Sequence, residues 1–170
     1  MSTRIAQRTL VHCPPAQAAQ RLSAYVREHG AADAGTAKLP LFVEAGLPGL
    51  PAPLRFERSV VATLQPHHLS GDMTPRYSVQ WAPAEPGPFP LFAGELRVEN
   101  DEDYHAFYLV LEGSYEPPLG LVGAGFDIIV GSRIAALCAR NLLAAIADAI
   151  ESAFAHDEAQ KATAQSPERT

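Results

Sequence analysis

The stretch LVLEGSYEPPLGLVGAGFD, residues 109–127, decides how this chain folds. An apolar run ends in Gly-Ser-Tyr, two prolines follow, and glycines recur at Gly120, Gly123 and Gly125. Such a stretch is either a phosphate-binding loop or the beginning of a long helix. A dinucleotide fingerprint needs G-x-G-x-x-G after a parallel strand, but the spacings here come in the reverse order. A P-loop needs a lysine directly after its glycines, whereas the next lysine here is Lys161.

The spacing of apolar residues favours the helix. Leu119 and Val122 already keep helical spacing, and a first helical turn tolerates prolines because their missing N–H has no helical partner there. We predict a helix from near Pro118 to about residue 155, followed by a disordered polar tail over 156–170. One stripe of this helix keeps a sustained helical period and must lie on a sheet; it consists of Leu121, Ile128, Ala135, Ala139, Leu142, Ile146, Ile150 and Ala153.

The rest of the chain reads mainly as strands separated by regularly spaced turn residues, which is typical of an antiparallel meander. We predict five strands, over residues 3–12, 54–65, 76–82, 89–99 and 104–113. A helix is predicted over 14–30, because Pro-Pro opens this segment and Gly closes it. Residues 30–53 form a long Pro/Gly-rich connection with one short helix around 40–46, and such a connection is often a gate or binding loop.

Alternation along the strands sorts their side chains into two faces. The inward face collects large apolar residues, among them Tyr77, Trp81, Phe92, Phe107 and Leu109. The helix stripe opposite is small, with Ala135 and Ala139 at its centre. We therefore predict an apolar pocket between the sheet and the last helix, with these seven residues as ligand contacts.

The same alternation places Arg58 and His105 on inward faces. Arg58 would hold an acidic group of a ligand and His105 would act as a general base. We favour instead that both lie at strand ends and reach solvent, because charged side chains are rarely buried without a partner. No catalytic residue is therefore assigned, and these two are the candidates for one.

The order strand, helix, Pro/Gly-rich loop, antiparallel strands and long C-terminal helix resembles the START-like or helix-grip superfamily, also called polyketide cyclase/dehydrase-like or Bet v 1-like. The residues that carry the resemblance are FPLFAGELRVE, LVLEGSYEPPLGLVGAGFD and IAALCARNLLAAIADAIESAF. It implies an α+β fold, in one domain over 1–155, whose curved antiparallel sheet encloses an apolar cavity against the helix. Members usually have six or seven strands, so a further strand is expected in 39–53 or 66–75.

Composition excludes several other classes of protein. The formal net charge is −6 and basic residues are scattered, so nucleic acid is not an expected partner. No uncharged apolar run is long enough to span a bilayer, so membrane insertion is not expected. Two distant cysteines, Cys13 and Cys138, do not form a disulfide framework, and with no signal-peptide pattern at the N-terminus we expect a cytoplasmic protein.

Metal and cofactor chemistry has little support in the sequence. His67 and His68 are adjacent and point apart, and Asp72 is the acidic residue near them, whereas a metal site needs three or four convergent ligands. Cys13 and Cys138 have no adjacent base and are expected to be small core residues. We predict no metal and no cofactor.

These observations favour a small-molecule binder, for a lipid, isoprenoid, quinone or polyketide-like ligand. A cyclase or dehydratase that uses the same cavity is the alternative, and an interaction or assembly factor without a ligand is the second. A second apolar face of this helix should also be buried against something. We favour segment 39–53 as its partner, and a second copy of the chain in a homodimer is the alternative. This face consists of Leu119, Val122, Phe126, Val130, Ile134 and Leu137.

Overall fold

The computed structural model describes residues 2–29, 37–45, 56–66, 74–83, 91–116 and 124–164, with the side chains of these ranges except 37–45, 56–60 and 124–130. In chain order the elements are β1 (Thr3–Val11), η1 (Pro15–Gln17), α1 (Ala18–His29), β2 (Ala37–Ala45), β3 (Phe56–Pro66), β4 (Arg76–Pro83), β5 (Leu91–Asn100), β6 (Phe107–Glu116) and α2 (Ala124–Ala164).

The strands form one six-stranded sheet in the order β1-β6-β5-β4-β3-β2, and each neighbouring pair is antiparallel. From β2 to β6 the chain is a plain meander, as predicted. The exception is β1, which joins the free side of β6, with Thr3 opposite Tyr115 and Val11 opposite Phe107. The first strand of the chain therefore completes the sheet beside the last.

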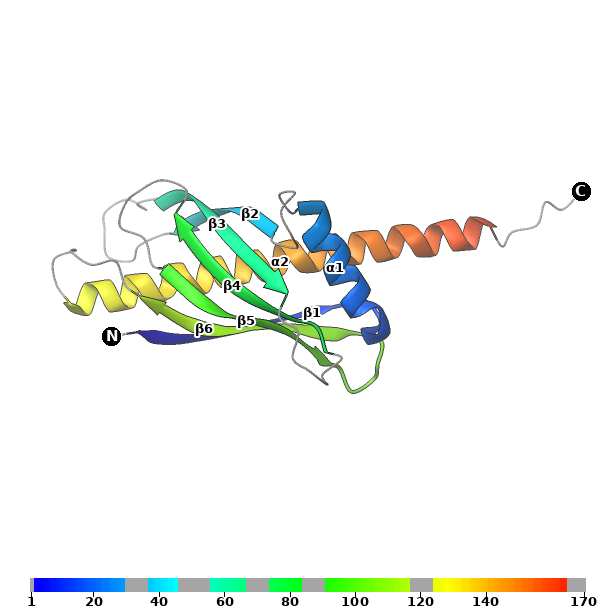
Figure 1. Ribbon diagram of the computed structural model, residues 1–170, viewed down its shortest axis with the longest axis horizontal. Coiled ribbons are helices and arrows are strands. Elements are labelled where there is room, and N and C mark those ends of the chain that lie inside the picture. The colour runs from blue at the N-terminus through cyan, green and yellow to red at the C-terminus, as the bar shows by residue number, and fades with distance from the viewer. Residues whose placement is uncertain are drawn as a thin grey trace, which may run out of the picture.

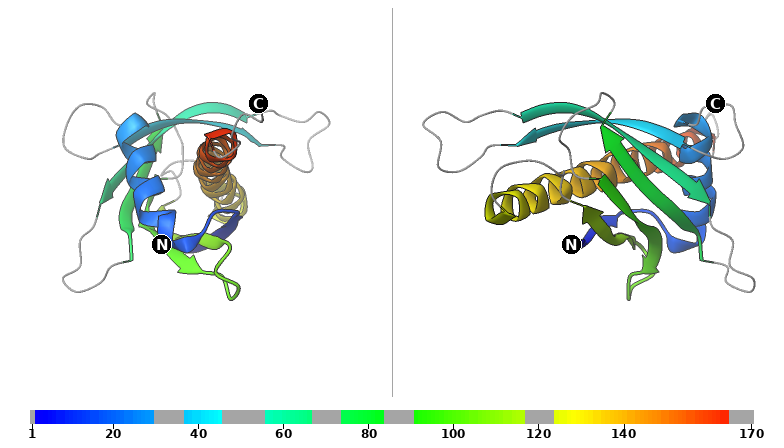
Figure 2. Two further views of the ribbon diagram at one scale, coloured as in Figure 1. Left: turned by 90° about the vertical axis from the view of Figure 1, so that its right-hand side faces the viewer. Right: turned by 60° about the vertical axis from the view of Figure 1, so that its left-hand side comes forward.

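Helix α2 lies on the concave face of this sheet. Seen end-on, the strands curve around it, with β1 on one side and β2 on the other (Figure 2). Among the strands, these two edge strands come closest to α2. Helix α1 crosses the second half of α2 (Figure 1). This arrangement is the predicted α+β helix-grip fold. None of the described helices is long and apolar enough to cross a membrane.

The faces assigned from alternation are confirmed for the described side chains of β4, β5 and β6, whereas His105, which precedes β6, is exposed. The inward residues Tyr77, Val79 and Trp81 of β4 and Phe92, Leu96 and Val98 of β5 are buried, and Leu109, Leu111 and Tyr115 of β6 join them in one core. The predicted stripe of α2 is buried from Ala135 to Ile150, whereas Ala153 is exposed. No charged or uncharged polar residue is buried in the described part of the chain.

Several predicted boundaries need correction. Residues 37–45 form strand β2 rather than a short helix at 40–46, which supplies the further strand expected within 39–53. Helix α2 continues to Ala164 rather than ending near residue 155. Residues 156–164, predicted as part of a disordered tail, are therefore helical. Two predicted regions lie outside the described residues: the helix start near Pro118, with Gly120 and Gly123, and the last residues of the tail.

The helix face that we expected to be covered is described only at Ile134 and Leu137. Ile134 is buried, and Leu137 is partly buried against the core, within a single copy of the chain. Strand β2, which includes part of the favoured segment, approaches α2. The other residues of this face have no described side chains, so what covers them stays a prediction.

The second half of α2 is held in place by polar contacts from the start of the chain. The backbone N–H of His12 donates to a carboxylate oxygen of Glu151 at 2.7 Å. Arg21 of α1 forms an ion pair with Asp157 at 2.8 Å and lies over the ring of Phe154. These contacts explain why the helix persists beyond the end of its apolar stripe.

Two glycines on the concave face allow strands β5 and β6 to carry a large side chain between them. Gly94 and Gly113 are opposite each other in the register. A methyl group added at Gly113 would come within 2.6 Å of the Phe92 ring and of the Gly94 Cα, and would also collide with the carbonyl oxygen of Ala93. The ring of Phe92 therefore occupies the space that both glycines leave free.

A cluster of ion pairs crosses the convex face over β1, β6 and β5. Arg97 contacts Glu99 at 2.8 Å and Glu112 at 3.2 Å, and Arg4 contacts the other oxygen of Glu112 at 3.3 Å. The hydrogen bond and charge of Arg97 lower the pKa of Glu112 below its ordinary value of 4.5, and Arg4 adds a smaller effect. The cluster thus joins three neighbouring strands on the side away from α2.

Replacement of Gly113 by alanine should destabilise the protein, because the added methyl group meets backbone atoms that have no freedom to move. We expect a loss of about 1–3 kcal/mol, as for other overpacked cores, measured as a lower urea midpoint. Gly131→Ala is the matched control. Its methyl group would lie 3.2 Å from the Tyr115 ring and helix propensity favours alanine, so equal losses in the two variants would contradict this account of the glycine pair.

The pH dependence of stability should reveal the role of Glu112. A lowered folded-state pKa means that its contribution is fully present above the ordinary value of 4.5 and is lost as the pH falls through the folded value. Glu112→Gln should therefore reduce stability at neutral pH and differ less from the wild type in acid. Urea unfolding at a series of pH values measures this, with Glu102→Gln in the exposed turn as the control. A constant difference at all pH values would be the contrary result.

Candidate functional site

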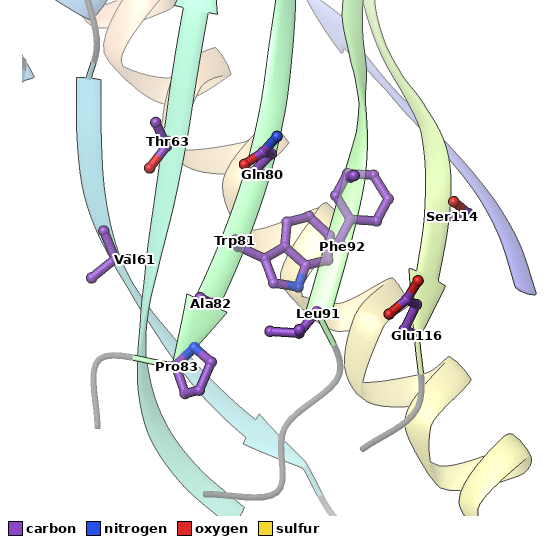
Figure 3. Close-up of a pocket in the computed structure, with 11 residues that line it drawn as sticks. Val61, Thr63, Gln80, Trp81, Ala82, Pro83, Leu91, Phe92, Ser114 and Glu116 are labelled. Atoms are coloured by element: carbon purple, nitrogen blue, oxygen red, sulfur yellow. The ribbon is translucent and has the colours of Figure 1, made fainter. Parts of the chain in front are cut away.

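A pocket of about 580 Å³ lies where β4 ends and β5 begins, and we call it the end pocket (Figure 3). The register between β4 and β5 runs from Arg76–Arg97 to Trp81–Phe92, and the two strands part beyond this last pair. The pocket therefore lies at the end of this strand pair.

Most of the wall of the end pocket comes from the convex face. The apolar part of this wall consists of Val61, Ala82, Pro83, Leu91 and Ala93, and the polar part consists of Thr63, Gln80, Ser114 and Glu116. Figure 3 views the site from this side, with α2 behind the strands. Our prediction had placed a pocket on the concave face, so these nine residues were missed. In the sequence all of them except Pro83 occupy alternating outward positions and look like ordinary surface residues.

Trp81 and Phe92 connect the end pocket to the concave face. Both line the pocket, yet their side chains belong to the inward set and are only 2% and 3% exposed. Their rings stack with centroids 3.9 Å apart and planes inclined by 10°. Because Phe92 is fixed over the glycine pair, it also determines where the Trp81 ring lies.

The indole nitrogen of Trp81 is a buried donor without an acceptor. Among buried side-chain nitrogen and oxygen atoms of the described residues, it stands alone in having no hydrogen-bond partner. Tyr77 lies on the same face of β4, four residues before Trp81. Its hydroxyl does have a hydrogen-bond partner, the Ser23 hydroxyl of α1 at 3.4 Å. A buried donor left unpaired costs about 1–3 kcal/mol, so this nitrogen requires an explanation.

The seven predicted ligand contacts all belong to one buried cluster between the sheet and α2. Four of them have no accessible surface and therefore touch no water-sized void: Phe107, Leu109, Ala135 and Ala139. In this structure those four are packed core. Trp81 and Phe92 are the two that also line the end pocket. A ligand contact for any of the seven stays a prediction.

The structure describes the two candidates for a catalytic residue to different extents. The backbone of Arg58 lies in β3 opposite Val43, and its side chain lies outside the described residues. His105 is exposed and precedes β6, which agrees with the favoured interpretation that it reaches solvent, whereas its place on the inward face by alternation is wrong. A turn closed by the bond from the Asp101 N–H to the Ala106 carbonyl occupies this segment, and it includes a positive φ of 55° at Tyr104. The strand alternation therefore does not extend back to His105.

Cys13 and Cys138 are buried and unpaired. Burial raises the pKa of the Cys13 thiol, an effect that Arg21 partly opposes, and it raises the pKa of Cys138 to about 12. Across the described ranges, no three His, Cys, Asp or Glu side chains gather as metal ligands would. His67, His68 and Asp72 lie outside those ranges.

No family model matches the chain, and no curated protein matches it. Solved structures with a similar arrangement include a protein from Thermus thermophilus, with 12% identity, 89% of this chain and 99% of that chain covered, and a TM-score of 0.43. An aromatase/cyclase from a Streptomyces species has 13% identity, coverage of 91% and 94%, and a TM-score of 0.42. A START superfamily protein from Mycobacterium smegmatis has 12% identity, coverage of 90% and 97%, and a TM-score of 0.40. All three TM-scores are below 0.5, so no conclusion about family or activity rests on these neighbours.

The two thiols should resist chemical labelling in the folded protein. A thiolate is the reactive form, and burial disfavours it for both cysteines. We expect slow reaction with a chromogenic disulfide reagent in mildly alkaline buffer and rapid reaction of both in denaturing urea. Cys13→Ser isolates Cys138, which should be the slower of the two. Rapid native labelling of Cys138 would show that the face of α2 against the sheet opens more readily than its packing indicates.

Proposed function

We propose that the protein binds a small, mainly apolar molecule between its sheet and α2, and that the end pocket gives access to this site. The observation that carries the proposal is that the end pocket reaches the stacked rings of Trp81 and Phe92, which otherwise belong to the closed core. A surface pocket that touches inward-facing aromatic rings offers an apolar ligand a wall to contact and a direction in which to enter.

The size and the chemistry of the end pocket support this proposal. Its volume of about 580 Å³ falls within the range of about 300–1,000 Å³ that is typical of small-molecule sites. Such sites combine a mainly apolar wall with a few polar groups that orient the ligand. Val61, Leu91 and the two rings supply the first, and Thr63 and Gln80 supply the second.

Packing also indicates which end of the concave face would receive the ligand. Phe107 and Leu109 are completely enclosed, as are Ala135 and Ala139 of α2 opposite. The other end, at Trp81 and Phe92, is where β4 and β5 part. An acid–base enzyme would need at least two converging groups that exchange protons, and among the residues that line the end pocket Glu116 is the one with an ionisable acid or base. A binder is therefore the function that we propose.

A thermal-shift screen of fatty acids, quinones, isoprenoids and aromatic polyketides tests the proposal. A ligand at about a hundred times its dissociation constant stabilises the folded state by roughly 2.7 kcal/mol, which corresponds to a rise in Tm of roughly 5 to 10 °C for a chain of this size. Ala82→Trp adds bulk at an exposed position in the wall of the end pocket and should abolish the rise.

Ala144→Trp, at an exposed position of α2, is the matched control and should keep the rise in Tm. Native mass spectrometry of the protein from its own host should show a bound small molecule that Ala82→Trp lacks. If no compound changes the Tm and no molecule is retained, the protein is not a binder of this kind.

A further inference from the structure

The geometry points to a specificity-determining group in this site: we propose that the Trp81 indole N–H donates a hydrogen bond to a neutral oxygen acceptor on the ligand. The ligand would then be an apolar molecule that carries a carbonyl or comparable oxygen, rather than a pure hydrocarbon chain. This inference rests on the proposed function, because it names the class of molecule that would bind at the same place.

The first support is the state of the donor. The Trp81 side chain is 2% exposed, and its nitrogen has no partner in the part of the chain that the structure describes. A tryptophan in an apolar core usually finds a partner for its N–H. At this position phenylalanine would fill much of the same space without leaving a polar atom unsatisfied. An indole here is unfavourable for the empty protein and becomes favourable once an acceptor arrives.

The second support is that the ring is fixed at the pocket. Trp81 lines the end pocket and stacks on Phe92, whose own position is set by Gly94 and Gly113. A donor on a ring held in this way fixes the place where the acceptor must lie, which is how a small number of polar groups orients a ligand in an apolar site.

The third support concerns the charge of the ligand. Glu116 is the charged residue of the pocket wall, and it disfavours an anionic group nearby. An ionised carboxylate would also lose its hydration beside the buried indole without gaining a cationic partner. A neutral oxygen avoids both costs, so a ketone, quinone or ester fits this site better than a free acid.

The buried nitrogen must become accessible for the bond to form. Figure 3 shows it on the edge of the ring that faces Leu91, the first residue of β5, and this residue is 48% exposed. A shift of this loosely covered side chain is the smallest movement that would admit an acceptor. The bond therefore forms only as the ligand enters.

A matched pair of probes tests the inference: 9-fluorenone and fluorene, two flat apolar molecules that differ in a carbonyl against a methylene group. Trp81 is the only tryptophan of the chain, so ¹⁵N-labelled protein gives a single indole N–H resonance. We expect fluorenone to move its proton downfield, as a new hydrogen bond does, and fluorene not to do so. Fluorenone should also bind more tightly, by roughly five- to a hundredfold.

Two variants locate the effect. Trp81→Phe removes the donor and should bring the two dissociation constants close together. Tyr25→Phe removes a hydroxyl from another buried aromatic residue, in α1 away from the pocket, and should keep the difference. If Trp81→Phe does not fold, the resonance of the wild-type protein decides the question alone.

The outcomes separate this inference from the proposed function. If both probes bind equally and fluorenone does not shift the indole resonance, the inference of an oxygen acceptor is wrong. The proposed binding of apolar molecules would not be affected by that result. An indole proton that is already hydrogen-bonded in the empty protein, and stays so when fluorenone is added, would show that the donor has another partner and would equally overturn the inference. If neither probe binds, the inference is contradicted for flat ketones of this size, and the thermal-shift screen still decides the proposed function separately.

Discussion

Burial of α2 against the concave face of one antiparallel sheet is the interaction on which the other features depend. A sheet that curves around a single helix brings its two edge strands, β1 and β2, closest to that helix, while the strands between them stand further away. The helix therefore presents small residues such as Ala135 and Ala139, and the middle strands fill the space with large ones such as Trp81 and Phe92. The glycine pair Gly94 and Gly113 contributes to the same packing, because the absence of side chains there makes room for the Phe92 ring on the sheet.

Much of this architecture follows from patterns that are local in the sequence. Period-two alternation identified the inward residues of β4, β5 and β6, because one face of each strand meets α2 and the other meets solvent. The helical period of apolar residues predicted most of the stripe on α2. Strand β2 was harder to recognise because it contains Pro40. A proline is tolerated there because β2 is an edge strand, where one side of the backbone has no partner to bond.

The candidate site was predictable only in part, and the reason is physical. Trp81 and Phe92 could be placed on the inward face from alternation, but whether they touch packed core or a pocket depends on where two strands part. That point is set by the register between β4 and β5, which the sequence does not display. The contacts that extend α2 beyond Ile150 were missed for a similar reason. They are ion pairs and backbone bonds made by Arg21 and His12, residues far away in the chain, and no periodic pattern records them.

The pairing of β1 with β6 also has a bearing on how the protein is made. Thr3 finds its partner only in Tyr115, so on a ribosome the first strand is synthesised long before the strand that it needs. The meander from β2 to β6 can form by pairing of segments that are neighbours in the sequence. Until β6 is made, the apolar residues of β1 stay exposed and its backbone N–H and C=O groups lack strand partners. Contacts between such distant positions slow folding, and an unpaired strand invites association with other chains. Pairing of β1 with β6 is therefore the folding step at which misfolding or aggregation is most favoured. It is also the step at which a chaperone would help most.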